Sequence, residues 1–249
     1  MMNRTRCLAL LLATLAVAGP AWAQREKPKD VSKSVAMDIR KEFTSEYKSK
    51  NVQQRQAAVD RLSPFKHEFI VKCLERAMRD ADASVRVAAA QRLGTQTAKP
   101  ALKVLGKAFK DRRNGESPET MVSILQAYRA HRSSPPLKPM KRLFDQASKE
   151  VQREVVITLR YVRNKDTVKF LAQLIDTPQP RNVDAGQNPP ASYWKDRVTR
   201  WSYWFSGVST TLVHLTGREF DSNKEARGWA TSSSRILSVA EGDKAVKDL

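Results

Sequence analysis

The sequence is poor in the residues that build disulfide frameworks and metal sites. It contains two cysteines, Cys7 and Cys73, and three histidines. Cys7 lies in a predicted leader segment, so an internal disulfide is excluded and burial must hold the fold together. The histidines, His67, His131 and His214, stand apart, and none has a second ligand residue three or four positions away. We therefore expect no metal site and no cofactor.

Catalytic motifs are also missing. The sequence shows no glycine-rich phosphate loop and no nucleophile elbow, and no cysteine and histidine are paired by position. Its acidic residues are interleaved with lysine and arginine, which is typical of solvated helix faces. Cys73 sits in an apolar helical pattern and is predicted to be a small core residue rather than a reactive thiol. We therefore nominate no catalytic residue and expect a protein that is not an enzyme.

Long apolar runs are scarce. The only one covers residues 7–19, follows Arg4 and Arg6, and precedes a small–x–small sequence that ends at Ala23. This arrangement is typical of a secretory signal peptide cleaved between Ala23 and Gln24. The run is too short to span roughly 30 Å of hydrocarbon as a helix. We expect an exported protein, periplasmic or secreted, with no transmembrane segment after cleavage.

What the sequence does contain is an internal repeat. Its clearest unit covers residues 80–111, where an acidic turn precedes one helical pattern and Pro100 lies at the start of a second. Leu93 and Leu105 occupy core positions of the two predicted helices. Gly94 follows the first helix, and we expect it to adopt the left-handed conformation of a helix stop.

The same pattern recurs along the chain. When the clearest unit is aligned with the segment before it, Arg86 falls on Arg55 and Asp111 falls on Asp80, and two later units follow at a comparable spacing. Because such hairpins bury their apolar stripes only by stacking, we predict an all-α protein with a right-handed α-solenoid of about four helical hairpins in residues 24–176. A helix at residues 31–47 is expected to cap its N-terminal end.

The clearest unit resembles the HEAT repeat family, in the sub-type called PBS-lyase-like. The resemblance implies an armadillo-type α-solenoid and a pairing of the turn aspartate with an arginine six positions later. It implies no activity, because these repeats occur in many proteins that are not enzymes. The other units depart from the pattern, with Ser49, Gly115 and Gln146 at the aspartate position and Met121 and Gln152 at the arginine position. The residues that carry the resemblance are Asp80, Asp82, Val85, Arg86, Ala88, Ala89, Ala90, Leu93 and Gly94.

The composition changes after residue 176. Residues 177–190 contain four prolines and one glycine, which predicts a linker loop. A helix ended by Gly217 is then predicted, because apolar residues alternate at steps of four and three. Two interpretations stay open: a helix that caps the last hairpin, or a seam for a coiled coil or a binding partner, which in a homodimer would be a second copy of the chain. The stripe consists of Trp194, Val198, Trp201, Phe205, Val208, Leu212 and Leu215.

Residues 215–229 carry a second resemblance. Their Leu-Thr-Gly-x-x-Phe sequence followed by Trp229 resembles the ending of some exported bacterial HEAT-repeat proteins, which implies a short closing helix. We accordingly predict a Trp-rich helical cap over residues 191–230. Residues 231–249 are predicted to be a flexible tail because they are mostly small and polar.

Positive charge dominates the chain. The net charge is +19, or +17 without the leader, which holds two arginines and no acidic residue. A basic surface attracts polyanions, although charge also serves solubility, and the sequence leaves both interpretations open. The candidate residues for binding an anion or another partner are Arg86, Arg92, Lys103, Lys107, Arg153 and Arg160.

The leading functional hypothesis is a non-catalytic scaffold that binds a protein or an anionic envelope polymer. The alternative is a nucleic-acid-binding enzyme of the DNA-glycosylase type, since some such enzymes are HEAT-like and basic. The predicted leader and the crowding of tryptophan near the C-terminus argue against that alternative, so nucleic acid is not the expected partner. The oligomeric state is left as a monomer or a dimer formed through the cap.

Overall fold

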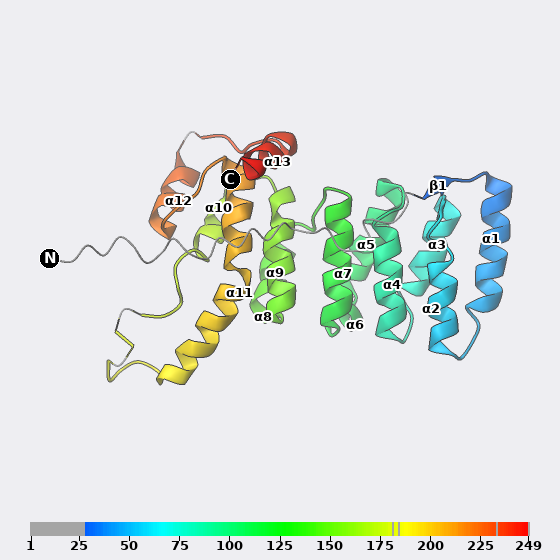
Figure 1. Cartoon of the computed structure of the whole chain (residues 1–249), viewed down its shortest axis with the longest axis horizontal. Coiled ribbons are helices and arrows are strands. Elements are labelled where there is room, and N and C mark those ends of the chain that lie inside the picture. The colour runs from blue at the N-terminus through cyan, green and yellow to red at the C-terminus, as the bar shows by residue number, and fades with distance from the viewer. Residues whose placement is uncertain (1–27, 181, 184, 233, 249) are drawn as a thin grey trace.

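The computed structural model describes residues 28–180, 182–183, 185–232 and 234–248, which form an all-α protein (Figure 1). The only strands in these ranges are β1 (Lys29–Asp30) and β2 (Phe65–Lys66), which pair in parallel. The predicted signal segment, with its cleavage position between Ala23 and Gln24, lies outside the described residues. Within them, no helix combines the length and the apolar character needed to cross a bilayer.

The helices follow one another as a row that runs from α1 to α11 (Figure 1). The first helices of successive pairs lie side by side, since α2 contacts α4, α4 contacts α7, α7 contacts α9 and α9 contacts α11. The bounds are α1 (Lys33–Glu46), α2 (Val52–Asp60), α3 (Glu68–Ala77), α4 (Ala83–Leu93), α5 (Ala98–Lys110), α6 (Arg112–Gly115), α7 (Pro118–Ala130), α8 (Leu137–Gln146), α9 (Lys149–Thr158) and α10 (Lys165–Ala172), with a 3-10 turn at Leu159–Tyr161.

Most of the local predictions for this row agree with the structure. The helices predicted for the four repeat units are α2 and α3, α4 and α5, α7 and α8, and α9 and α10, and the helix predicted at residues 31–47 is α1. Leu93 and Leu105 are fully buried. Cys73 is buried as well, and burial raises the pKa of its thiol to about 11. A thiol with such a pKa remains protonated at neutral pH, as expected of a core residue.

Gly94 differs from the prediction. Its φ angle is −61°, in the right-handed region, because the chain continues through further turns that end where Gln96 donates to the carbonyl of Phe65. Among the described residues, left-handed backbone occurs at Gly217, where it was expected, with a φ angle of 78°, and at Arg132 after α7, with a φ angle of 51°.

The aspartate–arginine pairing implied by the HEAT resemblance is also corrected. The Asp80 carboxylate is bound by Arg55 of the preceding hairpin, at 2.8 Å from Nε and 2.9 Å from Nη2. Arg86 instead donates from Nη1 to the carbonyls of residues 80 and 81, at 3.0 and 2.9 Å. Arg55 makes the same two bonds to residues 49 and 50, at 3.2 and 3.1 Å, so the pattern recurs in two successive hairpins.

The row ends in α11 (Ala191–Thr216), which packs against α9, and in α12 (Asn223–Thr231), which packs against α10. The second half of the predicted apolar stripe, Val208, Leu212 and Leu215, is buried in this packing. That half acts as a cap and is unavailable as a dimer seam. The first half of α11 extends beyond the other helices of the row (Figure 1).

The predicted flexible tail is replaced by a helix, α13 (Val239–Lys247), which packs on α11. Ser238 and Glu241 form a capping box that starts it. Asp243 receives a hydrogen bond from Nε2 of the fully buried His214 at 3.0 Å, and Arg163 donates to Nδ1 of the same ring at 3.1 Å. This segment is therefore helical because it packs against residues that lie far away in the sequence, and its local composition does not reveal those contacts.

Candidate functional site

Two of the six predicted binding residues are interior residues of α4. Arg86 and Arg92 are only 5 % and 4 % exposed. Arg86 is occupied by backbone carbonyls, and Nη2 of Arg92 lies 2.7 Å from Oδ1 of Asp60 on the neighbouring α2. Arg92 therefore joins α4 to α2, Arg86 holds the turn that precedes α4, and neither offers its charge to a partner at the surface.

The other four lie on separate parts of the molecule. Arg160 follows α9 and donates from Nε to the carbonyl of Ile157 at 3.0 Å, and its burial lowers its pKa. Arg153 lies over the ring of Tyr203, 5.9 Å from its centroid. Lys103 and Lys107 are exposed on α5, where Nζ of Lys107 pairs with Oε1 of Glu75 at 2.7 Å. The structure therefore does not gather the six residues into one stripe.

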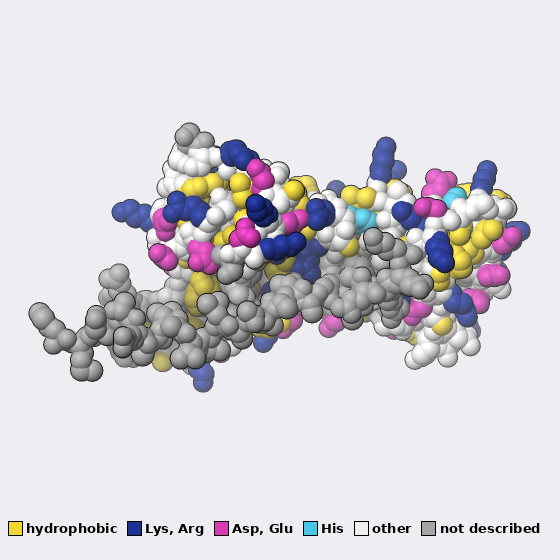
Figure 2. All heavy atoms as spheres, turned by 45° about the horizontal axis from the view of Figure 1, so that its top comes forward, with side chains coloured by type: hydrophobic (Ala, Val, Ile, Leu, Met, Phe, Trp, Pro, Cys, Tyr) yellow, Lys and Arg dark blue, Asp and Glu magenta, His cyan; other side chains and the backbone are white. Residues whose placement is uncertain are grey.

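The basic side chains visible in Figure 2 are likewise scattered among acidic ones. One helix stands out from this mixture. α5 carries four lysines, Lys99, Lys103, Lys107 and Lys110, and no acidic residue, and all four are exposed. The first helices of the pairs carry their charges in balanced or buried positions, so α5 is the most basic surface of the row.

A groove at the C-terminal end of the row is the strongest candidate for a binding site. It has a volume of about 700 Å³ and is enclosed by α8, α9, the segment after α10 and the first half of α11. This volume lies within the range of typical ligand sites. The lining residues are Phe144, Asp145, Gln152, Gln173, Leu174, Asp176, Thr177, Pro178, Tyr193, Asp196, Arg197, Arg200, Trp201 and Trp204.

The floor of the groove is aromatic and fixed by packing. Phe144 meets the ring of Trp204 edge-on with 5.4 Å between centroids, and it meets Phe170 in the same way at 5.7 Å. Trp201 packs against Phe205 at 4.4 Å and donates from Nε1 to the carbonyl of Leu174 at 3.1 Å. Rigid aromatic walls of this kind bind partners with little loss of side-chain entropy.

Two polar atoms at the floor lack hydrogen-bond partners. Trp204 Nε1 and Gln152 Oε1 are both shielded from solvent, and neither makes a hydrogen bond to any residue that the structure describes. The other end of the Gln152 amide is held, since Nε2 donates to the carbonyl of Phe144 at 2.8 Å. An unmet donor and an unmet acceptor in one floor require an explanation, because each costs about 1–3 kcal/mol.

The rim of the groove is charged and open. Its charged side chains are all exposed, and none makes an ion pair within the described part of the chain. Arg197 stacks on Tyr193 at 4.3 Å. The acidic members outnumber the basic ones, on a chain whose net charge is +19. The charged rim residues are Asp145, Asp176, Asp196, Arg197 and Arg200.

Sequence reasoning found the helix that carries the groove but missed the groove itself. The predicted stripe ran through Trp201 and Phe205 and left out Trp204, which is only 6 % exposed. The spacing of Trp201 and Trp204 on one helix was an available signal that both rings face the same neighbour. The partners on α8 and α9 lie far earlier in the chain, and no local pattern pointed to them.

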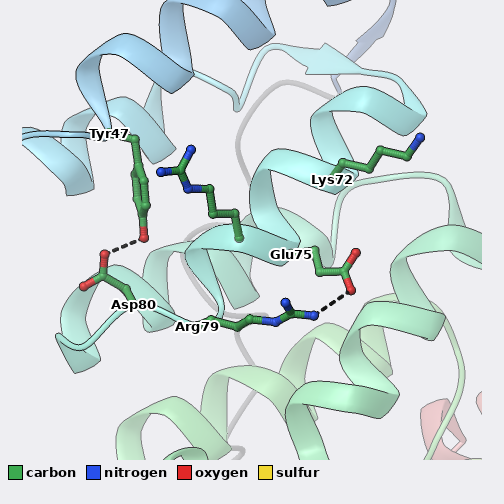
Figure 3. A pocket seen from close by; sticks show the side chains of 6 residues that line it. Tyr47, Lys72, Glu75, Arg79 and Asp80 are labelled. Carbon is green, nitrogen blue, oxygen red and sulfur yellow. Dashed lines mark hydrogen bonds and ion pairs between the residues drawn. The ribbon is translucent and has the colours of Figure 1, made fainter.

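A second hollow, of about 440 Å³, lies between α1 and α3 (Figure 3). Its acidic groups are already occupied: Asp80 is bound by Arg55 and by the hydroxyl of Tyr47, and Glu75 by Arg79 and Lys107. Burial acts to raise the pKa of Asp80, but the hydrogen bonds from Arg55 and Tyr47 outweigh it and lower that pKa. The carboxylates of this hollow are therefore already used in structural ion pairs and hydrogen bonds.

A metal site is absent from the same described residues, which hold no cluster of three or more histidine, cysteine or carboxylate side chains. The geometry thus offers one aromatic groove with unmet hydrogen-bonding groups and one lysine-rich helix. Comparison of the chain with protein-family models, with curated proteins and with solved structures found no match.

Proposed function

We propose that this chain is an exported, non-catalytic interaction scaffold, built as a HEAT-like α-solenoid, and that its partner binds in the groove between α8–α10 and α11. The solenoid interpretation is supported by two observations. The first helices of the pairs contact one another in series, and the carbonyl hydrogen bonds of Arg55 in one hairpin are repeated by Arg86 in the next. Export is proposed from the leader alone, with cleavage before Gln24.

The single observation that carries the binding function is the groove. Helical repeat proteins bind partners on surfaces formed by successive helices, and this groove lies where the row meets its terminal helix. Its floor is apolar and its rim is charged, which is the usual anatomy of a protein interface. A partner seated there would contact four separate segments of the chain.

A photo-crosslinking experiment tests this proposal. A photoreactive phenylalanine analogue replaces either Tyr193, at the groove, or Met37, on α1 at the other end of the row; both are exposed, at 40 % and 44 %. In the envelope fraction of the producing cell we expect a discrete crosslinked species from position 193 and none from position 37. Equal labelling at the two positions, or none at position 193, would count against the groove.

A second candidate function rests on α5. Its four lysines and lack of acidic residues favour binding of an anionic envelope polymer. Heparin serves as the probe: binding should fall linearly with the logarithm of salt concentration and be lost in a Lys103→Glu, Lys110→Glu double variant. Lys41→Glu on α1 is the matched control. If heparin binding does not depend on salt concentration, these lysines are not an anion-binding site and serve only to keep the protein soluble.

The DNA-glycosylase type of function is not favoured for the groove. Three aspartates against two arginines at its rim would repel a phosphate backbone, whose neutralisation by basic side chains dominates nucleic-acid binding. The lysine-rich α5 belongs to an earlier hairpin and is not part of the groove lining.

A further inference from the structure

Two residues that line the groove each have one buried polar atom without a partner among the described residues. Trp204 Nε1 carries a hydrogen to donate, and Gln152 Oε1 has lone pairs to accept one. Both atoms are shielded from bulk solvent. Of the buried side-chain atoms without a partner among the described residues, these two belong to residues that line the groove, where a bound group that supplies both an acceptor and a donor would satisfy them.

This requirement selects among ligand chemistries. A phosphate, sulfate or carboxylate group offers acceptors alone, an ammonium group offers donors alone, and a hydrocarbon chain offers neither. A peptide amide offers a C=O to Trp204 and an N–H to Gln152. The hydroxyl groups of a neutral sugar also offer both, so the floor restricts the ligand to an amide or a hydroxyl-bearing molecule.

The rim distinguishes these two. It carries exposed charges of both signs that lack ion-pair partners among the described residues. A neutral glycan can hydrogen-bond to them but brings no opposite charge, whereas a polypeptide brings charged side chains of both signs. Tyr193 and Trp201 add aromatic surface for its apolar side chains.

We propose that the groove binds an extended polypeptide segment, one backbone amide of which accepts a hydrogen bond from Trp204 Nε1 and donates one to Gln152 Oε1. This inference rests on the proposed scaffold function and specifies its partner. The excess of aspartate at the rim, Asp145, Asp176 and Asp196, favours a segment with at least one basic side chain. Small side-chain rotations open the two floor atoms to the ligand, as is common when interfaces form.

The test uses a phage-displayed library of random dodecapeptides selected on the chain from residue 24 onward. Synthetic copies of enriched peptides are then titrated by calorimetry against the unmodified protein and against variants. Trp204→Phe keeps an aromatic ring but removes the donor, and we expect it to weaken binding about tenfold. Asp196→Lys alters an exposed rim charge that has no ion-pair partner among the described residues, and it should weaken binding of basic peptides with little change in melting temperature.

Two matched controls separate local from general effects. Trp229→Phe removes the indole of a tryptophan on α12, outside the groove lining, and Glu42→Lys reverses an exposed charge on α1. Both should bind the selected peptides as the unmodified protein does. If Trp204→Phe lowers the melting temperature by many degrees, Asp196→Lys still decides whether the groove is the site.

The peptide proposal is overturned if no peptide is enriched, or if enriched peptides bind both groove variants unchanged. It is also overturned if cellohexaose, a neutral oligosaccharide, binds and is lost in Trp204→Phe, since the groove would then belong to a glycan. In that case a crosslink from position 193 would still support the scaffold. If position 193 gives no crosslink, the proposed scaffold function itself is contradicted.

Discussion

The two halves of the row differ in the side chains that fill their largest hydrophobic clusters. In the N-terminal half, one hydrophobic cluster spans α1 to α5, with small alanines between helices, and buried arginines connect neighbouring hairpins. In the C-terminal half, a second cluster spans α8 to α12 and is filled by the rings of Phe144, Phe170 and Trp204. The clusters meet at α7, where Ile124 belongs to the first and Leu125 to the second.

This difference accounts for the position of the groove. Small residues and arginine–carbonyl bonds allow α2 and α4 to approach closely and repeat the same contact, and in the hollow between α1 and α3 the acidic groups are already paired. Large rings fill space less regularly, and the first half of α11 diverges from the row. The regular contacts of the first helices thus serve the fold, while the irregular packing of aromatic rings around α11 leaves the groove that a partner can enter.

The largest expected effect comes from breaking the ion pair between Arg55 and Asp80 in the N-terminal half. Asp80→Ala leaves Arg55 without its bidentate partner in a largely buried position, and we expect a loss of about 3–5 kcal/mol in the free energy of unfolding. Urea denaturation measures it. Asp38→Ala, which removes an exposed pair with Lys41, is the control and should cost less than about 0.5 kcal/mol. Similar costs for the two variants would show that the link is not a structural one.

The next effect compares the two hydrophobic clusters directly. Leu105→Ala in the first cluster and Leu212→Ala in the second each remove a buried side chain and should cost about 2–5 kcal/mol. If the halves unfold together, both variants shift one common urea transition. Two separate transitions, each moved by one variant, would show that the halves are independent folding units.

A smaller effect is expected at the closing helix. A Cβ atom added at Gly242 would lie 2.2 Å from the carbonyl oxygen of His214, so Gly242→Ala must push α13 away from α11, at a cost of about 1–3 kcal/mol. Hydrogen exchange should then rise in α13 and stay unchanged in α2. Gly228→Ala on α12 meets no atom within 4 Å and should be neutral or slightly stabilising. Unchanged protection in α13 would contradict the close contact.

The smallest expected effect is a loss of folding stability at acidic pH. Burial lowers the pKa of His214, and the nearby charges of Arg160 and Arg163 act in the same direction, against the raising effect of Asp243. The pKa of His214 in the folded state therefore lies below the unfolded value of 6.5. The stabilisation of the folded state that comes from neutral His214 is fully present above pH 6.5, and it is lost as the pH falls towards the folded pKa. Burial lowers the pKa of His131 in the N-terminal half with the same sign.

Melting temperatures measured between pH 7.5 and 5 separate the two histidines. The unmodified protein should become less stable across this interval, and His214→Gln should reduce the slope while leaving the contribution of His131. Hydrogen exchange at pH 5 should rise first in α13, which Asp243 joins to His214. If melting temperature depends on pH in the same way in His214→Gln, a group other than His214 causes the acid sensitivity.

The sequence by itself determined the helices and their buried faces. Periodic apolar residues placed the four hairpins, Leu93 and Leu105 in the core, and Cys73 among them, because a helical period reports which face of a segment avoids water. The left-handed turn at Gly217 was also predictable, since only glycine adopts it without strain.

Only the tertiary structure decided where charged and aromatic side chains find their partners. Asp80 pairs with Arg55 rather than with Arg86, and α13 is ordered by residues far away in the chain. Arg86 and Arg92 resemble surface residues in the sequence, yet their long side chains reach polar atoms between the helices. The groove arises because α11 returns to α8 and α9 after a loop. Such contacts depend on distances between elements, and a local pattern contains no information about them.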